Sequence, residues 1–186
     1  NREKLIALNS KDGTISKTFG TDGKIRTGLN VTTPLIYKDS IVIVTWDRAV
    51  EVYDLHSGKT KWKLKYKKNV NKRFGGKKFN NKGANSWGGI SADIKRGILY
   101  FTTGNPHSYF DGTQRPGDNL GSNSLIAVDL NKKKILWSFQ ETTHDICNLD
   151  LPAPPILTSI LLNNKKIDVV VTPTKKANTL ILDRLT

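Results

Sequence analysis

The chain has 186 residues, of which 37% are apolar and 25% charged, so it can form a packed core and is not disordered throughout. Its one cysteine excludes an internal disulfide. No apolar run approaches the roughly 18–20 residues of a membrane-spanning helix, which excludes such a helix within this stretch, and no signal-peptide pattern is visible at its start. The net charge is +14, but eleven basic residues and no acidic one lie in Lys59–Lys82, and the other 162 residues hold 19 basic and 16 acidic residues.

The predicted elements are short β-strands, and no run of ten residues or more has helical periodicity. Four of them share a pattern, a β-rich run that ends in Asp or Asn, and three others are β-branched or apolar runs. In chain order the expected strands are Leu5–Asn9, Ile41–Thr45, Val50–Asp54, Gly97–Thr102, Leu125–Asp129, Asp168–Thr172 and Leu180–Asp183. Gly13 and Gly58 follow two of the shared runs, where a residue that tolerates positive φ can close a hairpin.

A tryptophan follows two of the shared runs at the same distance, since eight residues separate Asp54 from Trp62 and Asp129 from Trp137. An indole at a fixed place after a hairpin suits the packing of one repeat against the next. The residues that end the four runs are 45, 75 and 54 positions apart, which leaves room for several strands per repeat, as in a propeller blade. We therefore predict an all-β partial propeller of about three blades, with residues 1–186 forming a single fragment truncated at both ends.

The basic segment Lys59–Lys82 has two parts. In the first part Trp62, Leu64 and Tyr66 alternate with lysines, which is typical of a strand with one buried and one solvated face. The second part, Lys68–Lys82, is rich in Asn, Gly and Lys and is typical of a solvated loop. A solvated surface is the interpretation we favour, and a patch for an acidic partner, an anionic lipid surface or nucleic acid is the alternative.

The order Asp-x-x-x-Gly-x-x-x-Trp from Asp54 to Trp62 resembles the tryptophan-docking repeat of the quinoprotein dehydrogenases, which depend on pyrroloquinoline quinone (PQQ). Further motifs in the order of that family extend over essentially the whole chain: Ala84–Gly89, Thr103–Pro106, Arg115–Leu120, Ser124–Asp129, His144–Asp145, Asp150–Ala153, Thr174–Lys175 and Leu182–Arg184. The Asp-Leu-Pro-Ala stretch is more similar to the membrane-bound glucose, polyol and quinate dehydrogenase branch than to the methanol branch. The resemblance implies an eight-bladed propeller that uses PQQ and calcium.

The resemblance implies cofactor-binding roles for three residues. Trp87 matches the tryptophan on which the planar quinone stacks, since a flat conjugated ring gains apolar burial on an indole. Asn105 matches an amide ligand of calcium, and Lys175 matches a cation that stabilises negative charge on the quinone oxygens. Without the resemblance these three residues fit a core tryptophan, a turn and a solvated lysine. The carboxylate ligand of the family has only Asp47 as a plausible counterpart.

One position departs from the family. Its usual pattern is His-Asp-x-Trp-Asp, whose last aspartate is the implied general base, whereas this chain has His-Asp-Ile-Cys-Asn from His144 to Asn148. An amide cannot accept the hydroxyl proton of a substrate, although the Asn148 carbonyl can still bind calcium or substrate. Asp145 is kept as a catalytic candidate. For both Asp145 and Asp150, however, the interpretation we favour is a place in a turn or a role as a buried hydrogen-bond acceptor. His144 is expected to be structural and Cys147 a small packing residue.

The resemblance implies an oxidoreductase that oxidises an alcohol, polyol or sugar with PQQ and calcium and passes electrons to a quinone or cytochrome acceptor. In that reaction calcium polarises a quinone carbonyl, a base removes the hydroxyl proton and hydride passes to the quinone. The resemblance also implies a periplasmic location, membrane attachment only through segments outside this chain, and no nucleic-acid partner. Asn148 leaves the activity of this particular protein open.

Two alternatives from other classes of protein remain. The first is a propeller without cofactor that acts as a binding or assembly scaffold, which the loss of the base at Asn148 favours and the three cofactor-pattern residues oppose. The second is a polyanion-binding module that uses Lys59–Lys82, which would need aromatic side chains for stacking. Only Tyr66, Phe74 and Phe79 are available in that segment, and Tyr66 is expected to be buried.

Overall fold

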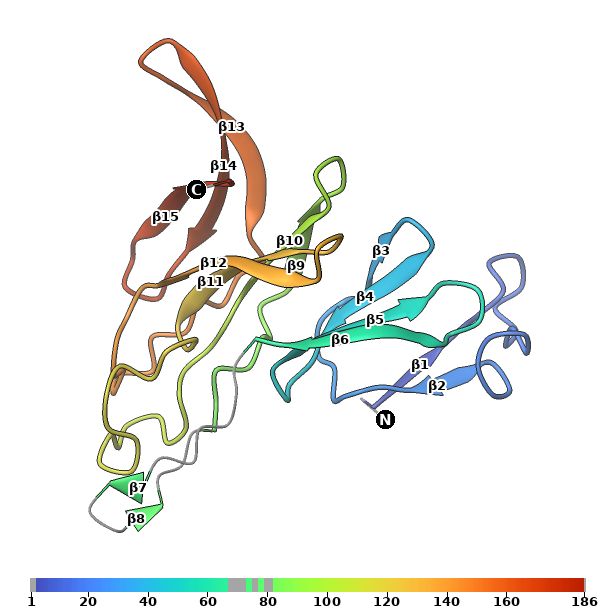
Figure 1. The fold of residues 1–186 in the computed structure, drawn as a ribbon, viewed down its shortest axis with the longest axis horizontal. Coiled ribbons are helices and arrows are strands. Elements are labelled where there is room, and N and C mark those ends of the chain that lie inside the picture. Colours follow the sequence, from blue (N-terminus) through green and yellow to red (C-terminus); the bar gives the residue numbers. More distant parts are fainter. Residues whose placement is uncertain (1–2, 67–72, 75–76, 79–81, 186) are drawn as a thin grey trace.

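A computed structural model describes residues 3–66, 73–74, 77–78 and 82–185. Every regular element within these residues is a β-strand, so the described part of the chain has no helix, and therefore none long and apolar enough to cross a membrane. The strands form two four-stranded sheets, one three-stranded sheet and two two-stranded sheets, and the larger sheets follow one another in chain order (Figure 1). The all-β prediction is confirmed.

Each sheet is an antiparallel arrangement of strands that are neighbours in sequence. We refer to β3–β6 as the first sheet, to β9–β12 as the second and to β13–β15 as the third. The strands are β1 (Lys4–Ile6), β2 (Lys24–Arg26), β3 (Leu35–Tyr37), β4 (Ser40–Val44), β5 (Ala49–Asp54), β6 (Thr60–Lys65), β7 (Arg73–Phe74), β8 (Lys77–Lys78), β9 (Ile90–Asp93), β10 (Ile98–Thr102), β11 (Ser124–Asp129), β12 (Lys134–Gln140), β13 (Ile156–Leu162), β14 (Lys165–Pro173) and β15 (Thr179–Asp183).

The aspartates that end the shared runs build the turns after their strands. The Asp54 carboxylate accepts hydrogen bonds from the Ser57 N–H and hydroxyl, both at 2.8 Å. These two bonds hold the pKa of Asp54 below its usual value, and the bond from the Ser57 N–H has the larger effect. Asp129 accepts in the same way from the N–H groups of the two turn residues that follow Leu130. The repeated residue is therefore explained by local turn chemistry, and Gly58 takes the expected positive φ of 70°.

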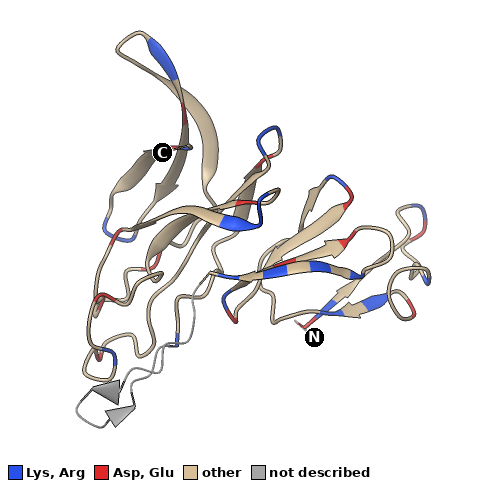
Figure 2. Cartoon of the chain, viewed as in Figure 1, with Lys and Arg blue, Asp and Glu red and all other residues tan. Residues whose placement is uncertain are grey.

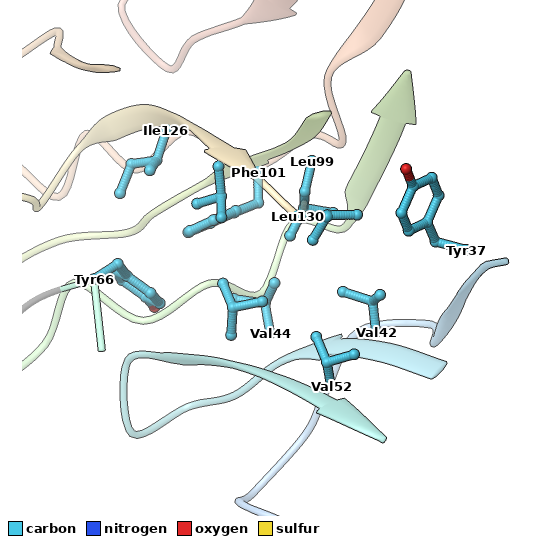
Figure 3. Packing of buried hydrophobic residues seen from close by; sticks show 11 residues of the cluster. Tyr37, Val42, Val44, Val52, Tyr66, Leu99, Phe101, Ile126 and Leu130 are labelled. Atoms are coloured by element: carbon cyan, nitrogen blue, oxygen red, sulfur yellow. The ribbon is translucent and has the colours of Figure 1, made fainter. Parts of the chain in front are cut away.

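Strand β10 is buried on both faces because it faces two neighbouring sheets. Leu99 and Phe101 point into an apolar core shared with the first sheet, where they meet Val42 and Val44 (Figure 3). Ile98 and Tyr100 belong to a second core shared with Val170 of the third sheet. Successive side chains of a strand point to opposite faces, so one short apolar strand joins both junctions.

The two repeat tryptophans lie at these junctions. Trp62 packs against the core between the first and second sheets, and Trp137 packs against the core between the second and third. The Trp137 indole N–H lies 3.4 Å from the carbonyl oxygen of Arg184, and its ring centroid is 6.0 Å from that of Tyr100. Both tryptophans are partly buried rather than fully enclosed, and their position matches the docking role expected from the repeat.

The alternation predicted for the basic segment is present in β6. Trp62 and Leu64 are partly buried and Tyr66 is buried, whereas the lysines between them, which are blue in the cartoon of Figure 2, are exposed. One of these lysines, Lys63, pairs with the buried carboxylate of Glu51 at 2.8 Å. The loop predicted for Lys68–Lys82, together with its two phenylalanines, lies largely outside the residues whose side chains are described.

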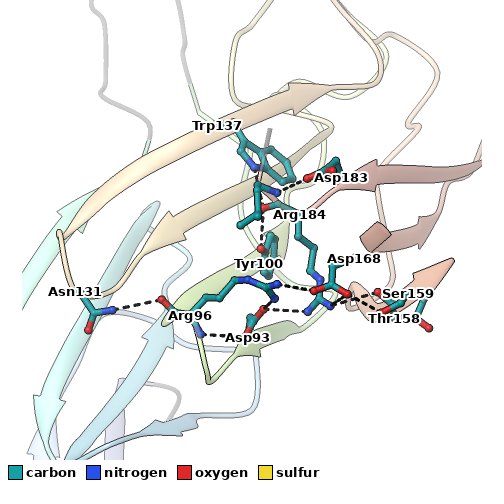
Figure 4. Close-up of polar contacts among 11 residues, drawn as sticks. Asp93, Arg96, Tyr100, Asn131, Trp137, Thr158, Ser159, Asp168, Asp183 and Arg184 are labelled. Atoms are coloured by element: carbon teal, nitrogen blue, oxygen red, sulfur yellow. Dashed lines mark hydrogen bonds and ion pairs between the residues drawn. The ribbon is translucent and has the colours of Figure 1, made fainter. Parts of the chain in front are cut away.

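A ring of four charged side chains joins the second sheet to the third (Figure 4). The Arg96 guanidinium binds Asp93 and Asp168, both at 2.6 Å. The Arg184 guanidinium binds the same two carboxylates at 3.1 and 3.3 Å. A hydrogen bond from the Ser159 hydroxyl, together with the one from Arg96, lowers the pKa of Asp168 to about 2.

This lowered pKa gives an expected pH dependence of stability. A carboxylate with a depressed folded pKa stabilises the fold above its unfolded pKa of about 4, and that stabilisation is lost as the pH falls towards about 2. We expect Asp168→Asn to be less stable than the unmodified chain at pH 7 and to lose less further stability between pH 4 and pH 2. Urea midpoints measured at pH 7, 4 and 2.5 test this.

The matched control is Asp22→Asn, which alters an exposed aspartate that has no ion pair among the described residues. Its midpoints should follow those of the unmodified chain at all three pH values. An equal decline of the Asp168→Asn variant and the unmodified chain from pH 4 to 2.5 would contradict the assignment.

Candidate functional site

A cavity of about 540 Å³ opens where the turns of the first and second sheets meet the segment before the third. It is the place where most of the residues singled out from the sequence come together. Its wall includes two tryptophans, a tyrosine, two asparagines and one carboxylate: Trp46, Trp87, Tyr109, Asn105, Asn148 and Asp150. This mixture of aromatic surface and a few convergent polar groups is typical of small-molecule sites.

Gly104 lies between the Trp87 indole and the Asp150 carboxylate, in a segment whose place is fixed by backbone pairing. The segment before β9 pairs with the segment after β10, through bonds from the Ala84 N–H to the Asn105 carbonyl at 2.7 Å and from the Gly104 N–H to the Asn85 carbonyl at 2.9 Å. A Cβ at Gly104 would lie 2.3 Å from a carboxylate oxygen of Asp150 and 2.8 Å from the indole nitrogen of Trp87. Glycine is therefore required for the indole and the carboxylate to approach each other.

Asn105 is the centre of a buried amide network. Its side chain, 2% exposed, donates from Nδ2 to Oδ1 of Asn148 at 2.6 Å and accepts at Oδ1 from Nδ2 of Asn123 at 2.9 Å. Its backbone N–H donates to the Asp150 carboxylate at 2.7 Å. Asn123 was not identified from the sequence, where only its place before a strand distinguishes it. The network fixes the orientation of the Asn148 side chain on the cavity wall.

Lys175 reaches the cavity wall from the turn between β14 and β15. Its ammonium group binds the Asp150 carboxylate at 2.7 Å and the backbone carbonyl oxygen of Asn148 at 3.2 Å. The neighbouring Lys176 points to Glu141 instead, with 3.6 Å between the charged atoms. Asp150, for which the sequence favours a place in a turn or a role as a buried acceptor, thus links the third sheet to the cavity.

Asp145 lies behind the wall and does not line the cavity. One of its carboxylate oxygens accepts from the Cys147 N–H at 2.8 Å, and the other accepts from the Leu149 N–H at 2.7 Å and from Asn123 at 2.9 Å. Its carbonyl accepts a hydrogen bond from the buried guanidinium of Arg115, whose burial lowers the pKa of that group. Asp145 is 2% exposed, so this placement fits the buried-acceptor role, and a catalytic role for Asp145 stays a prediction.

His144 and Cys147 lie in the same loop as Asp145, and both side chains are exposed. His144 is exposed and its Nδ1 lies 2.9 Å from the Gly117 carbonyl oxygen, which fits a structural role. Cys147 is exposed, so its side chain does not have the packing role expected of it. This part of the loop is held instead by the bond from the Cys147 N–H to the Asp145 carboxylate.

The donors for a metal ion are incomplete among the described residues. Asn105 Oδ1 already accepts a hydrogen bond from Asn123 Nδ2, and Asn148 Oδ1 accepts one from Asn105 Nδ2. Asp150 is paired with Lys175. Asp47 is exposed and is absent from the cavity wall. No group of three or more His, Cys, Asp or Glu that could hold a metal occurs within the described part of the chain. Since calcium takes about six to eight oxygen ligands, these residues alone do not fit a calcium site.

The same wall does fit a planar conjugated ligand. Trp46 and Trp87 are 38% and 39% exposed, and both line the cavity. Indole surface favours flat aromatic or quinonoid rings, and the Lys175 ammonium beside it favours anionic oxygens. The absence of a Cβ at Gly104 keeps the Trp87 indole against the polar side of the wall. The quinone-binding roles of Trp87 and Lys175 stay predictions, and the geometry is compatible with both.

Comparison with known proteins identifies the family of the chain and agrees with its fold. The model of the family "PQQ: Glucose/ethanol/alcohol dehydrogenase, beta-propeller domain" matches residues 1–186. The chain is 26% identical over 208 residues to the quinoprotein glucose dehydrogenase of Escherichia coli (strain K12), covering 99% of this chain and 26% of that protein. It is 24% identical to the glycerol dehydrogenase large subunit of Gluconobacter oxydans (strain 621H), covering 97% of this chain and 28% of that subunit.

A solved structure shows the same fold. The quinohemoprotein alcohol dehydrogenase from Comamonas testosteroni superimposes with a TM-score of 0.79 at 23% identity, covering 100% of this chain and 31% of that one. The chain thus spans about a quarter to a third of the length of these relatives. The three larger sheets correspond to part of a β-propeller, as the sequence predicts.

Proposed function

Because the chain belongs to the PQQ family of glucose, ethanol and alcohol dehydrogenase β-propeller domains, we propose that it forms part of the quinone site of a dehydrogenase that oxidises an alcohol, polyol or sugar. The family model supports PQQ as the cofactor. A metal ion, taken here to be calcium held by further ligands besides the described residues, a quinone or cytochrome as electron acceptor, and a periplasmic location belong to this proposal.

One observation supports the proposal above the others. Trp87, Asn105 and Asn148 come from segments up to 61 residues apart and meet on one cavity, with Lys175 bound to its wall through Asp150. A cofactor-free scaffold would have no need for a partly exposed indole beside a buried amide network and an ion pair. Residues assembled from several loops on a rigid sheet framework are typical of a binding site.

The residues of this chain would perform four tasks in such a site. The Trp87 indole binds the flat ring, and Lys175 fixes the position of its anionic oxygens. Asn105 holds Asn148 in place through the 2.6 Å hydrogen bond, so that the Asn148 carboxamide can orient the substrate hydroxyl. Tyr109 and Trp46 restrict the entry of water to the cavity. Bound PQQ would supply the hydride acceptor, and Asn148 cannot accept the hydroxyl proton.

A cofactor-free scaffold is the second candidate, and one specific observation favours it. The residue at the position of the family's base is Asn148, and the other nearby carboxylates are engaged, Asp145 by backbone groups and Asp150 by Lys175. A protein that has lost the proton acceptor can keep the fold for binding alone.

Direct binding of PQQ distinguishes the two candidates. We expect the full chain to bind PQQ saturably in the presence of calcium, with quenching of tryptophan fluorescence, since a bound quinone lies against an indole. Trp87→Ala should weaken the binding at least tenfold, because it removes the stacking surface. Phe139→Ala is the control, since Phe139 is 40% exposed on β12 and does not line the cavity. Absence of saturable binding by the unmodified chain would support the scaffold instead.

A further inference from the structure

The four tryptophans of the chain fall into two pairs with different surroundings. Trp62 and Trp137 pack against the apolar cores at the sheet junctions. Trp46 and Trp87 belong to none of the core clusters and line the cavity instead, with 38% and 39% of their surfaces exposed. Trp62, Trp137 and Trp87 already have a role in the fold or in binding the planar ring, whereas Trp46 so far has only the task of restricting the entry of water.

The backbone of Trp46 is held at a fixed place. It lies in the tight turn between β4 and β5, where the Arg48 N–H donates to the Thr45 carbonyl at 3.1 Å. The Trp46 N–H donates to the Leu29 carbonyl at 2.6 Å, and its carbonyl accepts a hydrogen bond from the Asn85 side chain. A large indole carried on a rigid turn but left partly exposed suits a preformed contact for a ligand.

The same hydrogen bond relates the two indoles of the cavity. Asn85 also lines the cavity and stands two residues before Trp87 in the segment that leads to β9. It therefore ties the turn that carries Trp46 to the segment that carries Trp87. The turn that carries Trp46 belongs to the first sheet, and the segment that carries Trp87 leads into the second sheet. The cavity therefore has one indole from each side of the junction between these sheets.

We propose that Trp46 is a second aromatic wall of the quinone site, so that a planar conjugated ring bound in the cavity contacts the indoles of both Trp46 and Trp87. This inference rests on the proposed function and deepens it by naming a further binding residue. Contact with two indoles increases the apolar surface that the ring buries, and each aromatic contact favours binding beyond the buried area. No proton or electron transfer is assigned to Trp46.

The test measures PQQ affinity and not turnover. Using the full chain with calcium, we expect Trp46→Ala to weaken PQQ binding about tenfold and Trp46→Phe to stay within about threefold of the unmodified chain, because a smaller aromatic ring keeps part of the contact. The share of tryptophan emission that saturating PQQ quenches should fall in both variants. Phe139→Ala, with a similar exposed fraction and a place away from the cavity, should change neither quantity.

The possible results separate this inference from the proposed function. Affinity of Trp46→Ala within twofold of the unmodified chain, with Trp87→Ala still weakened, would overturn the role of Trp46 and leave the proposed function standing. No saturable PQQ binding by the unmodified chain would overturn both. Equal loss of affinity in Trp46→Ala and Trp46→Phe, accompanied by a lower urea midpoint, would show that Trp46 supports the turn and would overturn the aromatic contact.

Discussion

In a complete dehydrogenase that contains this chain, Asn148→Asp is expected to raise the rate of PQQ-dependent alcohol or sugar oxidation by a factor of about 10²–10⁴. The carboxamide of Asn148 lines the cavity, and its Oδ1 already accepts the 2.6 Å hydrogen bond from Asn105. The substitution keeps that acceptor and replaces the amide NH₂ by a second oxygen that can take the hydroxyl proton. Reduction of an artificial dye near pH 8, where the introduced carboxylate is ionised, measures the effect.

The affinity for PQQ serves as the internal control for this experiment. It should stay within a few-fold, because stacking on Trp87 does not depend on the proton transfer. Asn9→Asp is the matched variant, since it adds the same charge at an exposed residue three positions after β1, where the other repeats have aspartate, and it should leave the rate unchanged. If the unmodified protein already turned over at about 1–10³ s⁻¹, another group such as Asp150 would be the base.

The second large effect concerns stability. Phe101→Ala should lower the free energy of unfolding by about 3–5 kcal/mol, because a fully buried ring leaves a cavity that a rigid junction cannot fill. Phe101 is 0% exposed and lies in the core between the first and second sheets, with its ring centroid 4.8 Å from that of Tyr66. Urea denaturation followed by circular dichroism measures the loss.

Two further variants show whether the loss of stability in Phe101→Ala comes from the buried position of the ring. Phe139→Ala removes the same ring from a position that is 40% exposed, so its cost should be about 1 kcal/mol or less. Phe101→Leu keeps much of the buried volume and should fall between the two. A loss below about 1 kcal/mol for Phe101→Ala would mean that the junction between these sheets contributes little to the stability of the fold.

The strands that the sequence predicts are those whose pattern is local. Strand β5 is the run Val50–Asp54 with one residue added at its start, and β11 is Leu125–Asp129 with one residue added at its start, because alternation and the terminal aspartate both lie within the run. Strand β13 was not predicted, since Thr158 and Ser159 interrupt its apolar residues. Its signal was the Asn-Asn pair of the turn that follows, whose φ angles are 51° and 59°.

The candidate site was predictable only in part, because its contacts join residues that are distant in sequence. The resemblance identified Trp87, Asn105 and Lys175, and the structure brings all three to or beside the cavity. Trp46 contacts Asn85, 39 residues away, across the junction of the first and second sheets. Asn123 contacts Asn105, 18 residues away, within the long connection between β10 and β11. No local pattern specifies such pairs, so composition and periodicity cannot identify them.

The burial of β10 on both faces has a consequence for the way the chain loses its structure. Leu99 and Phe101 serve one junction while Ile98 and Tyr100 serve the other, all within five residues. A movement of this strand that opens one junction also disturbs the second, so the three large sheets are coupled and cannot open independently, as stacked repeats with separate interfaces can. The backbone amides of β10 are accordingly placed to exchange with solvent only when the whole assembly opens, and this strand marks its slowest-exchanging unit.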